Sequence, residues 1–322
     1  MYYIDHELQL KETQKPIPKD NEFLIRICAF GINRPDIYQR KGQYPAPKDA
    51  SPILGLEVAG IVEHAPSSSS FKKGDAVMAL THGGGYAEYV CVDTRHCLPK
   101  PQSLSFAEAA ALPETLFTVW ANLYVDNHLP KGAIVLIHAG SSGIGSIAIQ
   151  IAKYWQCKVI TTCAGNKIDF CQQLGADLVI NRETQDFVAI TKKAFGGADY
   201  ILDMLGGGYM ERNIATLKPK GRLININYML GANIELNFMP IMLKRLIITG
   251  STLRSRSTEE KAEIAQSIQK YLMQAIEARE IIPIIDKYFK ASDIENAHQY
   301  MESNQHKGKI VAIWPEYLTK VE

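Results

Sequence analysis

A glycine- and serine-rich turn at residues 139–145 carries the clearest chemistry in this 322-residue sequence. It reads Ala-Gly-Ser-Ser-Gly-Ile-Gly, follows an apolar run at Ile134–Ile137 and precedes an apolar helical pattern at Ser146–Trp155. Small residues let backbone N–H groups approach phosphate oxygens, and the N-terminus of a helix adds positive potential. The turn therefore predicts a site for the pyrophosphate of a dinucleotide, although Ser142 replaces the second glycine of the usual pattern. A plain strand-to-helix turn is the alternative.

The residues after the next predicted strand, Lys158–Thr162, indicate which dinucleotide binds. An acid at this place would bond the ribose hydroxyls of NAD and repel a 2′-phosphate, but residues 161–165 contain no acid. Lys167 and Arg182 follow at the next two loop positions, and their charges could attract that phosphate. The sequence therefore favours NADPH. The alternative for both cations is an ordinary solvated position on the surface.

Two polar residues near this turn have simpler interpretations. His138 ends the buried strand and has no recognisable nucleophile partner, so we expect a packed, hydrogen-bonded side chain rather than a catalytic base. Asp203 ends a later strand on the cofactor side, or it caps the turn at Gly206–Gly208.

The elements that must position these residues alternate between strands and helices. Further predicted strands are Leu178–Ile180, Tyr200–Leu202 and Arg222–Ile226, and further predicted helices are Lys167–Leu174, Asp186–Ala194 and Tyr209–Leu217. Repeated β-α-β units require a parallel sheet with helices on both faces. The sequence thus predicts a doubly wound α/β domain.

The residues before and after this region differ in pattern. From Phe23 to about Leu98, short apolar runs separated by turns predict a β-rich half, and Ser105 with Glu108 predicts a helix start near a domain boundary. Leu246–Gly250 reads as one more strand. Thr258–Glu280 reads as one long helix with Thr258 as its N-cap, and Lys309–Ile313 is the clearest strand of a tail of short strands.

Composition excludes several classes of protein. The 35 basic and 34 acidic residues give a net charge of +1, so there is no broad field for nucleic acid or an anionic membrane surface. The start of the chain, Met1–Glu7, lacks the pattern of a secretory signal, and the most apolar segment is interrupted by His138 and the glycine turn. Six cysteines without a Cys-x-x-Cys pair read as reduced thiols. We expect a cytoplasmic protein without a membrane span.

Several motifs, in order along nearly the whole chain, resemble the zinc-independent quinone oxidoreductases of the medium-chain dehydrogenase/reductase superfamily, and most of all the tumour-suppressor-inducible NADPH quinone oxidoreductase type. They are Asn33–Asp36, Gln39–Tyr44, Leu54–Gly60, Gly83–Tyr89, Ile137–Gly145, Leu174–Asp177, Ser251–Arg256 and Lys307–Val311. The resemblance implies a β-rich GroES-like catalytic domain, residues 1–114 and 256–322, and a Rossmann NADP-binding domain, residues 115–255.

The resemblance also implies a site without metal. Zinc-dependent relatives carry a cysteine where this chain has Asn33 and a histidine where it has Leu56, and neither replacement can hold Zn²⁺ in their place. The four-cysteine structural lobe of those relatives is also absent. Hydride transfer to an acceptor that is already activated, such as a quinone or a conjugated carbonyl, needs no metal.

Residue by residue, the resemblance assigns NADPH to a cleft between the domains. The pyrophosphate matches Ser141, Ser142, Gly143 and Ile144, and the adenosine phosphate matches Gly165, Lys167 and Arg182, where many relatives carry tyrosine at the position of Arg182. Among the other cofactor residues, Asn227, Tyr228 and Met229 follow the last alternating strand, and Thr252, Leu253 and Arg254 approach the nicotinamide side. Thr118, with Asn33 and Tyr44, matches residues that line the nicotinamide and substrate end. Tyr44 is expected to stack on or bond the substrate, with Asn33 orienting it. The alternatives are a packed loop aromatic for Tyr44 and a turn cap for Asn33.

The function implied is NADPH-dependent reduction of a quinone or conjugated carbonyl by metal-free hydride transfer. One alternative is a 2-alkenal or enoyl reductase of the same fold. Another is a protein that binds NADPH and acts through a partner without catalysis. The apolar strand Leu246–Gly250 resembles the family's edge strand that pairs across a homodimer, which would cover an exposed sheet edge.

Overall fold

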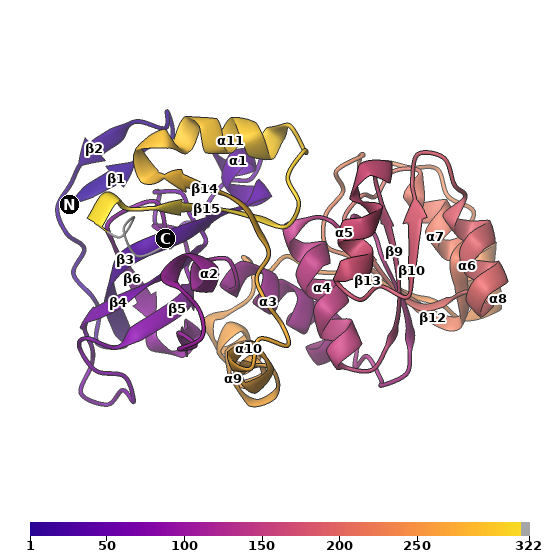
Figure 1. The fold of residues 1–322 in the computed structure, drawn as a ribbon, viewed down its shortest axis with the longest axis horizontal. Coiled ribbons are helices and arrows are strands. Elements are labelled where there is room, and N and C mark those ends of the chain that lie inside the picture. Colours follow the sequence, from indigo (N-terminus) through magenta and orange to yellow (C-terminus); the bar gives the residue numbers. More distant parts are fainter. Residues whose placement is uncertain (317–322) are drawn as a thin grey trace. The chain divides into compact units, whose positions relative to one another are not determined.

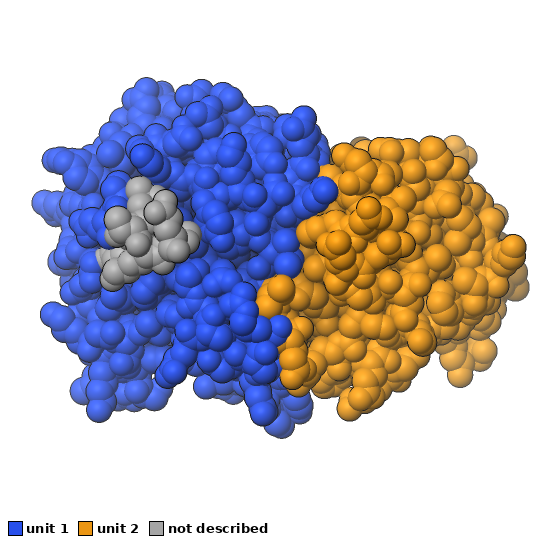
Figure 2. Space-filling model, in the orientation of Figure 1, with its two compact units in different colours: residues 1–117, 254–279, 283–322 blue, residues 118–253, 280–282 orange. Residues whose placement is uncertain are grey.

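The computed structural model describes residues 1–316 and divides the chain into two compact units (Figure 2). Unit 1 comprises Met1–Phe117, Arg254–Arg279 and the residues from Pro283 onward. Unit 2 comprises Thr118–Leu253 and Glu280–Ile282. Residues 317–322, the end of the predicted GroES-like domain, lie outside the described residues. The chain therefore leaves the first unit and returns to it.

Unit 1 is built on a largely antiparallel sheet of seven strands. The order is β14-β15-β3-β4-β5-β7, and β6 pairs with β3. The strands are β3 (Glu22–Ile32), β4 (Glu57–His64), β5 (Ala76–Leu80), β6 (Tyr89–Asp93), β7 (Cys97–Pro99), β14 (Ile285–Lys290) and β15 (Lys309–Ile313). Only β14 and β15 pair in parallel. Figure 1 shows the C-terminal strand β15 beside the N-terminal β3, with which it pairs from Ile310 opposite Ile32.

Helices and a small hairpin complete unit 1. They are β1 (Tyr2–Ile4), β2 (Leu10–Glu12), α1 (Arg34–Arg40), α2 (Phe106–Ala110), α9 (Thr258–Tyr271), α10 (Met273–Glu277) and α11 (Ile294–Glu302), and the chain passes into unit 2 within α3 (Pro113–Trp120). The sequence patterns did not indicate α1 or α11. α1 is only two turns long and α11 interrupts a tail of short strands, so neither gives a long periodic signal.

The predicted long helix from Thr258 to Glu280 was wrong in two details. Its N-cap is Ser257, whose Oγ accepts from the Glu260 N–H at 3.1 Å while the Glu260 carboxylate accepts from the Ser257 N–H at 2.8 Å. This reciprocal pair is the capping box, which requires a spacing of three residues from the cap. The helix also ends at Tyr271. The next residue, Leu272, is fully buried, and α10 then buries Ala275 and Ile276.

Unit 2 has a six-stranded sheet in which every pairing is parallel. The order β10-β9-β8-β11-β12-β13 joins β8 (Ile134–Ile137), β9 (Lys158–Cys163), β10 (Leu178–Asn181), β11 (Ala198–Asp203), β12 (Leu217–Asn225) and β13 (Ile247–Gly250). Counted from β8, the order is 3-2-1-4-5-6, which is that of a doubly wound dinucleotide-binding sheet.

Helices cover both faces of this sheet. α4 (Gly143–Tyr154) and α5 (Ile168–Gln173) lie on one face, and α6 (Phe187–Phe195) and α7 (Tyr209–Thr216) lie on the other (Figure 1). The short helix α8 (Met239–Lys244) precedes β13. Buried apolar residues from the strands and from α6 and α7, including Leu136, Ile201 and Ile214, form one core cluster. The predicted fold class is confirmed. Among residues 1–316, every helix is too short or too polar to span a lipid bilayer.

Candidate functional site

The glycine turn of unit 2 has the close packing that a phosphate loop requires. A Cβ on Gly140 would lie 2.0 Å from Thr161 Oγ1, and one on Gly145 would lie 2.3 Å from the Ala139 carbonyl oxygen, so both positions exclude a side chain. Ser142 is the N-cap of α4, and its Oγ accepts from the Gly145 N–H at 3.0 Å. The helix therefore begins at Gly143, three residues before the predicted start at Ser146.

The first amides of α4 remain available for a ligand. Gly143 and Ile144 occupy the first helical positions, whose N–H groups have no carbonyl in the preceding turn to bond. α4 is 12 residues long, and its aligned peptide dipoles favour a negative charge at this end. Together with Ser141, these are the residues predicted for the pyrophosphate, and they stand in sequence at one helix terminus.

The turn lies at the point where the winding of the sheet reverses. β8 pairs with both β9 and β11, and its helix α4 covers one face while α7, after β11, covers the other. Ser142 Oγ lies 3.6 Å from Met204 Sδ in the loop after β11. In open parallel sheets, the crevice at the carboxyl ends of the strands at such a point is where ligands bind.

The expectations for His138 and Asp203 are confirmed. The Asp203 carboxylate accepts from the Leu205 N–H at 2.7 Å and from the Gly206 N–H at 3.2 Å, so it caps the glycine turn. His138 is fully buried, with one ring nitrogen 2.9 Å from Thr162 Oγ1 and the other 2.7 Å from Asn213 Oδ1. Burial lowers the pKa of His138, which favours its neutral form, and these bonds connect the end of β8 to β9 and α7 beside the phosphate turn.

The surroundings of Gly165 correct one expectation. The Glu183 carboxylate accepts from the Gly165 N–H at 3.2 Å, so this end of β9 is not free of acid. The acid was missed because it follows β10, the neighbouring strand, rather than β9 itself. Its position two residues after Asn181, where β10 ends beside β9, was the available signal.

Both predicted phosphate cations lie in this region. Arg182 is exposed, and its backbone N–H donates to the Cys163 carbonyl at 2.9 Å, while Lys167 is 8% exposed. The pKa of Cys163 is lowered by a hydrogen bond with Cys171 and also by the charges of Arg182 and Lys167, whereas Glu183 opposes this effect. The end of β9 is therefore surrounded by two cations and one carboxylate.

The residues predicted for the nicotinamide side lie in unit 2, apart from Arg254; Thr118 is on α3 and the others are on loops. Asn227 follows β12, with Oδ1 accepting from the Tyr228 N–H at 2.8 Å, and Met229 N–H donates to the Met204 carbonyl at 3.3 Å. Tyr228 and Met229 are exposed. Thr252 and Leu253 follow β13, so these loops share the carboxyl edge of the sheet with the phosphate turn.

Thr118 is linked to the loop after β13 through one asparagine. Asn122 Nδ2 donates to the Thr118 carbonyl at 2.9 Å, and Ser251 Oγ donates to Asn122 Oδ1 at 2.9 Å. This connection holds the start of unit 2 against the segment that contains Thr252.

In unit 1, Asn33 is held by a buried ion pair. Lys309 Nζ lies 2.6 Å from Glu57 Oε1, and it also donates to Asn33 Oδ1 at 2.5 Å. Asn33 Nδ2 donates to Glu57 Oε1 at 2.9 Å. All three side chains are buried, and Glu57 Oε2 also accepts from the Glu114 N–H at the start of α3, at 2.9 Å. The Asn33 amide therefore has a fixed orientation, with both of its polar atoms engaged.

Two further acids, Asp36 and Glu114, lie beside this triad. Asp36, on α1, accepts from the Asn33 N–H at 2.8 Å and from the Tyr86 hydroxyl at 3.3 Å. Burial raises the pKa of Asp36 to about 7, and burial together with the charge of Glu57 raises the pKa of Glu114 to about 8. Burial lowers the pKa of His298, which lies 3.0 Å from the Tyr86 hydroxyl, to about 3. These acids can hold protons near neutral pH.

Tyr44 lies just after α1, beside a cation. Its N–H donates to the Tyr38 carbonyl at 3.2 Å, and the Arg254 guanidinium carbon lies 5.6 Å from the centre of its ring. Arg254 Nη1 donates to Gln39 Oε1 at 2.6 Å. Burial and the charge of Glu114 raise the pKa of Tyr44, so its phenol stays protonated at neutral pH. α1 thus connects both predicted catalytic residues, because Asn33 is its N-cap and Tyr44 follows its last turn.

Sequence reasoning did not single out Glu57, Lys309, Gln39 or Glu114. The signal for the first two was present, since each is a charged residue directly before an apolar run, residues 58–62 for Glu57 and 310–313 for Lys309. Charged side chains are rarely fully buried unless they are paired. Their pairing joins positions 252 apart in the sequence, which no local pattern reveals.

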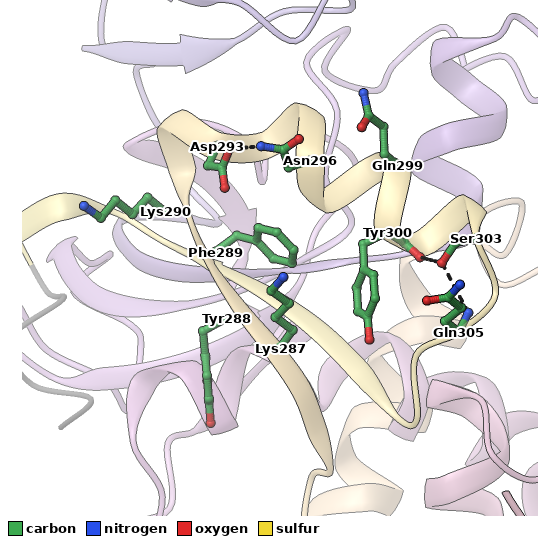
Figure 3. A pocket seen from close by; sticks show the side chains of 10 residues that line it. All are labelled: Lys287, Tyr288, Phe289, Lys290, Asp293, Asn296, Gln299, Tyr300, Ser303 and Gln305. Atoms are coloured by element: carbon green, nitrogen blue, oxygen red, sulfur yellow. Dashed lines mark hydrogen bonds between the residues drawn. The ribbon is translucent and has the colours of Figure 1, made fainter. Parts of the chain in front are cut away.

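A separate hollow of about 730 Å³ lies over β14 and α11 (Figure 3). Its lining includes Lys287, whose ammonium lies 4.9 Å from the Phe289 ring centre and 5.3 Å from that of Tyr300. None of the residues predicted from the sequence for the cofactor or substrate lines this hollow.

Family comparisons agree with the two kinds of unit. Residues 19–102 match the alcohol dehydrogenase GroES-like domain, and residues 143–270 match the zinc-binding dehydrogenase family. Among solved structures, an NAD-dependent alcohol dehydrogenase is 26% identical, with a TM-score of 0.83 over 97% of this chain and 99% of that one. The CurK enoyl reductase is also 26% identical, with a TM-score of 0.85 over 97% of each chain.

A curated relative is more similar in sequence. The quinone oxidoreductase of Sus scrofa is 34% identical over 310 residues, which cover 92% of this chain and 91% of the relative. By this match and by its two family domains, the chain belongs to the medium-chain dehydrogenase/reductase superfamily, among its quinone oxidoreductases.

Proposed function

We propose that the protein uses NADPH to reduce a quinone or a conjugated carbonyl compound. The observation that carries the proposal is the phosphate turn at the N-terminus of α4, at the reversal point of a doubly wound sheet, with Lys167 and Arg182 near the end of the neighbouring strand β9. The quinone oxidoreductase relatives support the class of acceptor.

The residues of unit 2 fit a dinucleotide. Gly140 and Gly145 cannot carry a Cβ, and the α4 amides of Gly143 and Ile144 would bond the pyrophosphate beside Ser141 and Ser142. Gly165, Lys167 and Arg182 would hold the adenosine phosphate, and Thr118, Asn227, Tyr228, Met229, Thr252 and Leu253 would line the nicotinamide. When bound, NADPH supplies a hydride.

The residues of unit 1 would act on the acceptor. Tyr44 is a neutral phenol that can stack on a flat acceptor or donate a hydrogen bond to its oxygen. Asn33 is held between Lys309 and Glu57, and each of its amide atoms keeps capacity for one more hydrogen bond, so it can orient the acceptor. These roles are part of the proposal.

The donor set of unit 1 does not fit the zinc ion after which the matched family is named. Asn33 and Leu56 replace a thiolate and an imidazole, and Asn33 Oδ1 already accepts from the Lys309 ammonium. A cation here would be repelled by that ammonium and would lack soft ligands. No catalytic step of the proposal uses a metal.

A second candidate function is supported by the fold neighbours. The enoyl reductase CurK has the same fold, and a reductase of 2-alkenals or enoyl compounds would use the same cofactor residues. A protein that binds NADPH and acts through a partner, without catalysis, is the remaining alternative.

The two units correspond, in this proposal, to the predicted domains at residues 1–114 with 256–322 and at 115–255. We further propose a homodimer formed through β13, the open edge of the parallel sheet. Ile247 and Ile248 on this strand are exposed, and so are Phe238, Met242 and Leu243 on and beside α8. An apolar edge of this kind is normally covered. The cytoplasm remains the location we propose.

A panel of acceptors tests the proposal. NADPH oxidation is measured with quinones, 2-alkenals and enoyl thioesters at matched concentrations. Faster turnover of quinones supports the first candidate, and faster turnover of the alkenals or thioesters supports the second. NADPH binding without oxidation by any acceptor would instead support the partner-binding alternative.

A further inference from the structure

Arg254 is a buried cation whose hydrogen-bonding capacity is mostly unused. It is 8% exposed, and Nη1 donates to Gln39 Oε1 at 2.6 Å. Nε and Nη2 are buried without a partner among residues 1–316. Among these described residues, no carboxylate forms an ion pair with the Arg254 guanidinium, although the charges of Asp36 and Glu114 act on it from farther away. A guanidinium normally directs its planar set of donors at an oxyanion.

A second buried cation lies next to it. Lys261, on α9, is 6% exposed, and its ammonium donates to the Arg254 carbonyl at 3.2 Å. Within the described residues, Lys261 also lacks an ion pair. Burial lowers the pKa of both side chains, and the charge of Arg254 lowers that of Lys261 further, whereas Glu114, Asp49 and Glu260 oppose this effect. Two buried cations therefore lie beside Tyr44, and among residues 1–316 neither has a carboxylate in ion-pair contact; the acids that act on them do so from farther away.

Burying a charge without a counter-ion is costly, and a chain gains nothing for its fold by keeping one. Here the guanidinium is also held in place, because Gln39 fixes one end and the ring of Tyr44 lies 5.6 Å from its carbon. A fixed, unsatisfied donor in a region with little water is the arrangement that stabilises a developing negative charge.

We propose that Arg254, assisted by the charge of Lys261, binds the acceptor oxygen on which negative charge develops during reduction. The inference rests on the proposed function and specifies it. In this inference Arg254 binds the acceptor, a quinone or conjugated carbonyl, whereas the family resemblance implies that it binds the cofactor.

The step balances with the reactants already named. The acceptor gains a hydride, which carries two electrons and one proton, and NADPH is oxidised to NADP⁺. The acceptor becomes a hydroquinone monoanion or an enolate, and its oxyanion lies against Nε and Nη2 of Arg254. A proton from water, directly or through the Tyr44 phenol, then completes the reduction.

The first test separates an acceptor role from a cofactor role. Arg254→Met should lower kcat by at least about 100-fold while the Kd of NADPH, measured by fluorescence titration, changes by less than about threefold. Arg254→Lys should retain an intermediate kcat. Added guanidinium ion should partly restore Arg254→Ala. Arg95→Met removes an exposed arginine paired with Asp93 and serves as the control with unchanged kcat. An unchanged kcat with weakened NADPH binding would overturn the inference.

Stability distinguishes this role from a structural one. Because Arg254 has no ion pair, Arg254→Met should unfold at the same temperature as the parent or higher. A clear loss of thermal stability in both Arg254→Met and Arg254→Lys would mean that the side chain supports the fold, and would overturn the inference.

The second test does not depend on turnover. 4-Nitrophenolate resembles a hydroquinone monoanion and reports its ionisation by visible absorbance. The parent protein should bind it at least about tenfold more tightly than Arg254→Met does, and should lower the pH at which the bound phenol ionises. Equal binding by both proteins overturns the inference even if the parent reduces quinones. If none of the acceptors supports oxidation of NADPH by the parent protein, the proposed function is wrong. The 4-nitrophenolate titration still tests whether Arg254 binds an anion.

Discussion

At the scale of single residues, the site depends on charges that come from distant parts of the sequence. Lys309 reaches Asn33 across 276 positions, and together with Glu57 these side chains form a buried triad that contains an internal ion pair. The sequence indicated Asn33 and Tyr44 through their motifs. It did not indicate their partners Glu57 and Lys309, because an ion pair between side chains of β4 and β15 is not visible in the sequence of either strand alone.

The same limit applies to the phosphate side. The absence of acid in residues 161–165 was read along one strand, but Glu183 reaches Gly165 from the neighbouring strand. The glycine turn was easier to predict, because its function depends on backbone geometry within one short segment.

Arg182 and Glu183 should have opposite effects on cofactor choice. Arg182→Ala should raise the Kd of NADPH roughly 10-fold to 100-fold, the value of a lost charge-assisted hydrogen bond, and should leave NADH binding unchanged. Lys167→Ala should act in the same direction. Fluorescence titration with both cofactors measures these constants.

Glu183→Gln is the matched control for charge. It removes a carboxylate that would repel the 2′-phosphate, so it should tighten NADPH binding relative to NADH. Equal losses for NADPH and NADH in the Arg182 variant would refute the phosphate assignment.

At the scale of elements, the strands and helices of unit 2 were predicted best, because each carries a long apolar pattern of one period. The short helices α1, α8 and α11 were missed, and the start of α9 was misplaced by one residue. In that case Thr258 was taken as the cap although the spacing of Ser257 and Glu260 is the one that closes a capping box.

Ser257→Ala should lower the free energy of unfolding by about 1 kcal/mol, because the first turn of α9 loses the acceptor for the Glu260 N–H. Thr258→Ala, one residue further along, should have a clearly smaller effect. Urea denaturation of both variants measures the difference. A larger loss in the Thr258 variant would show that the cap is assigned to the wrong residue.

Two acids, Asp36 on α1 and Glu114 on α3, should make the free energy of unfolding fall as pH rises. The pKa is raised to about 7 for Asp36 and to about 8 for Glu114, so the folded state binds these protons more tightly than the unfolded chain. Their stabilising effect is complete below the unfolded carboxyl pKa of about 4 and is lost as pH passes through the folded values.

Between about pH 6.5 and 8, Glu114 should reduce the free energy of unfolding by roughly 1 kcal/mol per pH unit. In Glu114→Gln, the free energy of unfolding should fall less steeply with pH, by the roughly 1 kcal/mol per pH unit that Glu114 contributes. Urea denaturation across this range provides the measurement, and an unchanged slope in the variant contradicts the assignment.

At the scale of the whole molecule, the return of the chain to unit 1 could be foreseen from the resemblance, because the β-rich pattern reappears after the alternating region. The right-handed crossover rule limits the possible orders of the parallel strands but does not fix the one observed. Neither the resemblance nor the crossover rule shows whether another chain covers the open sheet edge at β13.

Ile248→Lys should convert a dimer into a monomer, because a charged side chain on an edge strand prevents strand pairing. Light scattering coupled to size-exclusion chromatography measures the mass. Ile17→Lys changes an isoleucine of unit 1 that is 90% exposed, and it should leave the mass unchanged. A parent protein that is monomeric at all concentrations would contradict the proposed dimer.

The central claim is metal-free hydride transfer from NADPH to a quinone. It is tested most directly by the kcat/KM for NADPH and for NADH with para-benzoquinone, measured in the presence of a strong chelator. We predict rapid oxidation of NADPH, at least about tenfold favoured over NADH and unaffected by the chelator. Loss of activity with the chelator, or no oxidation of either cofactor, would contradict the claim.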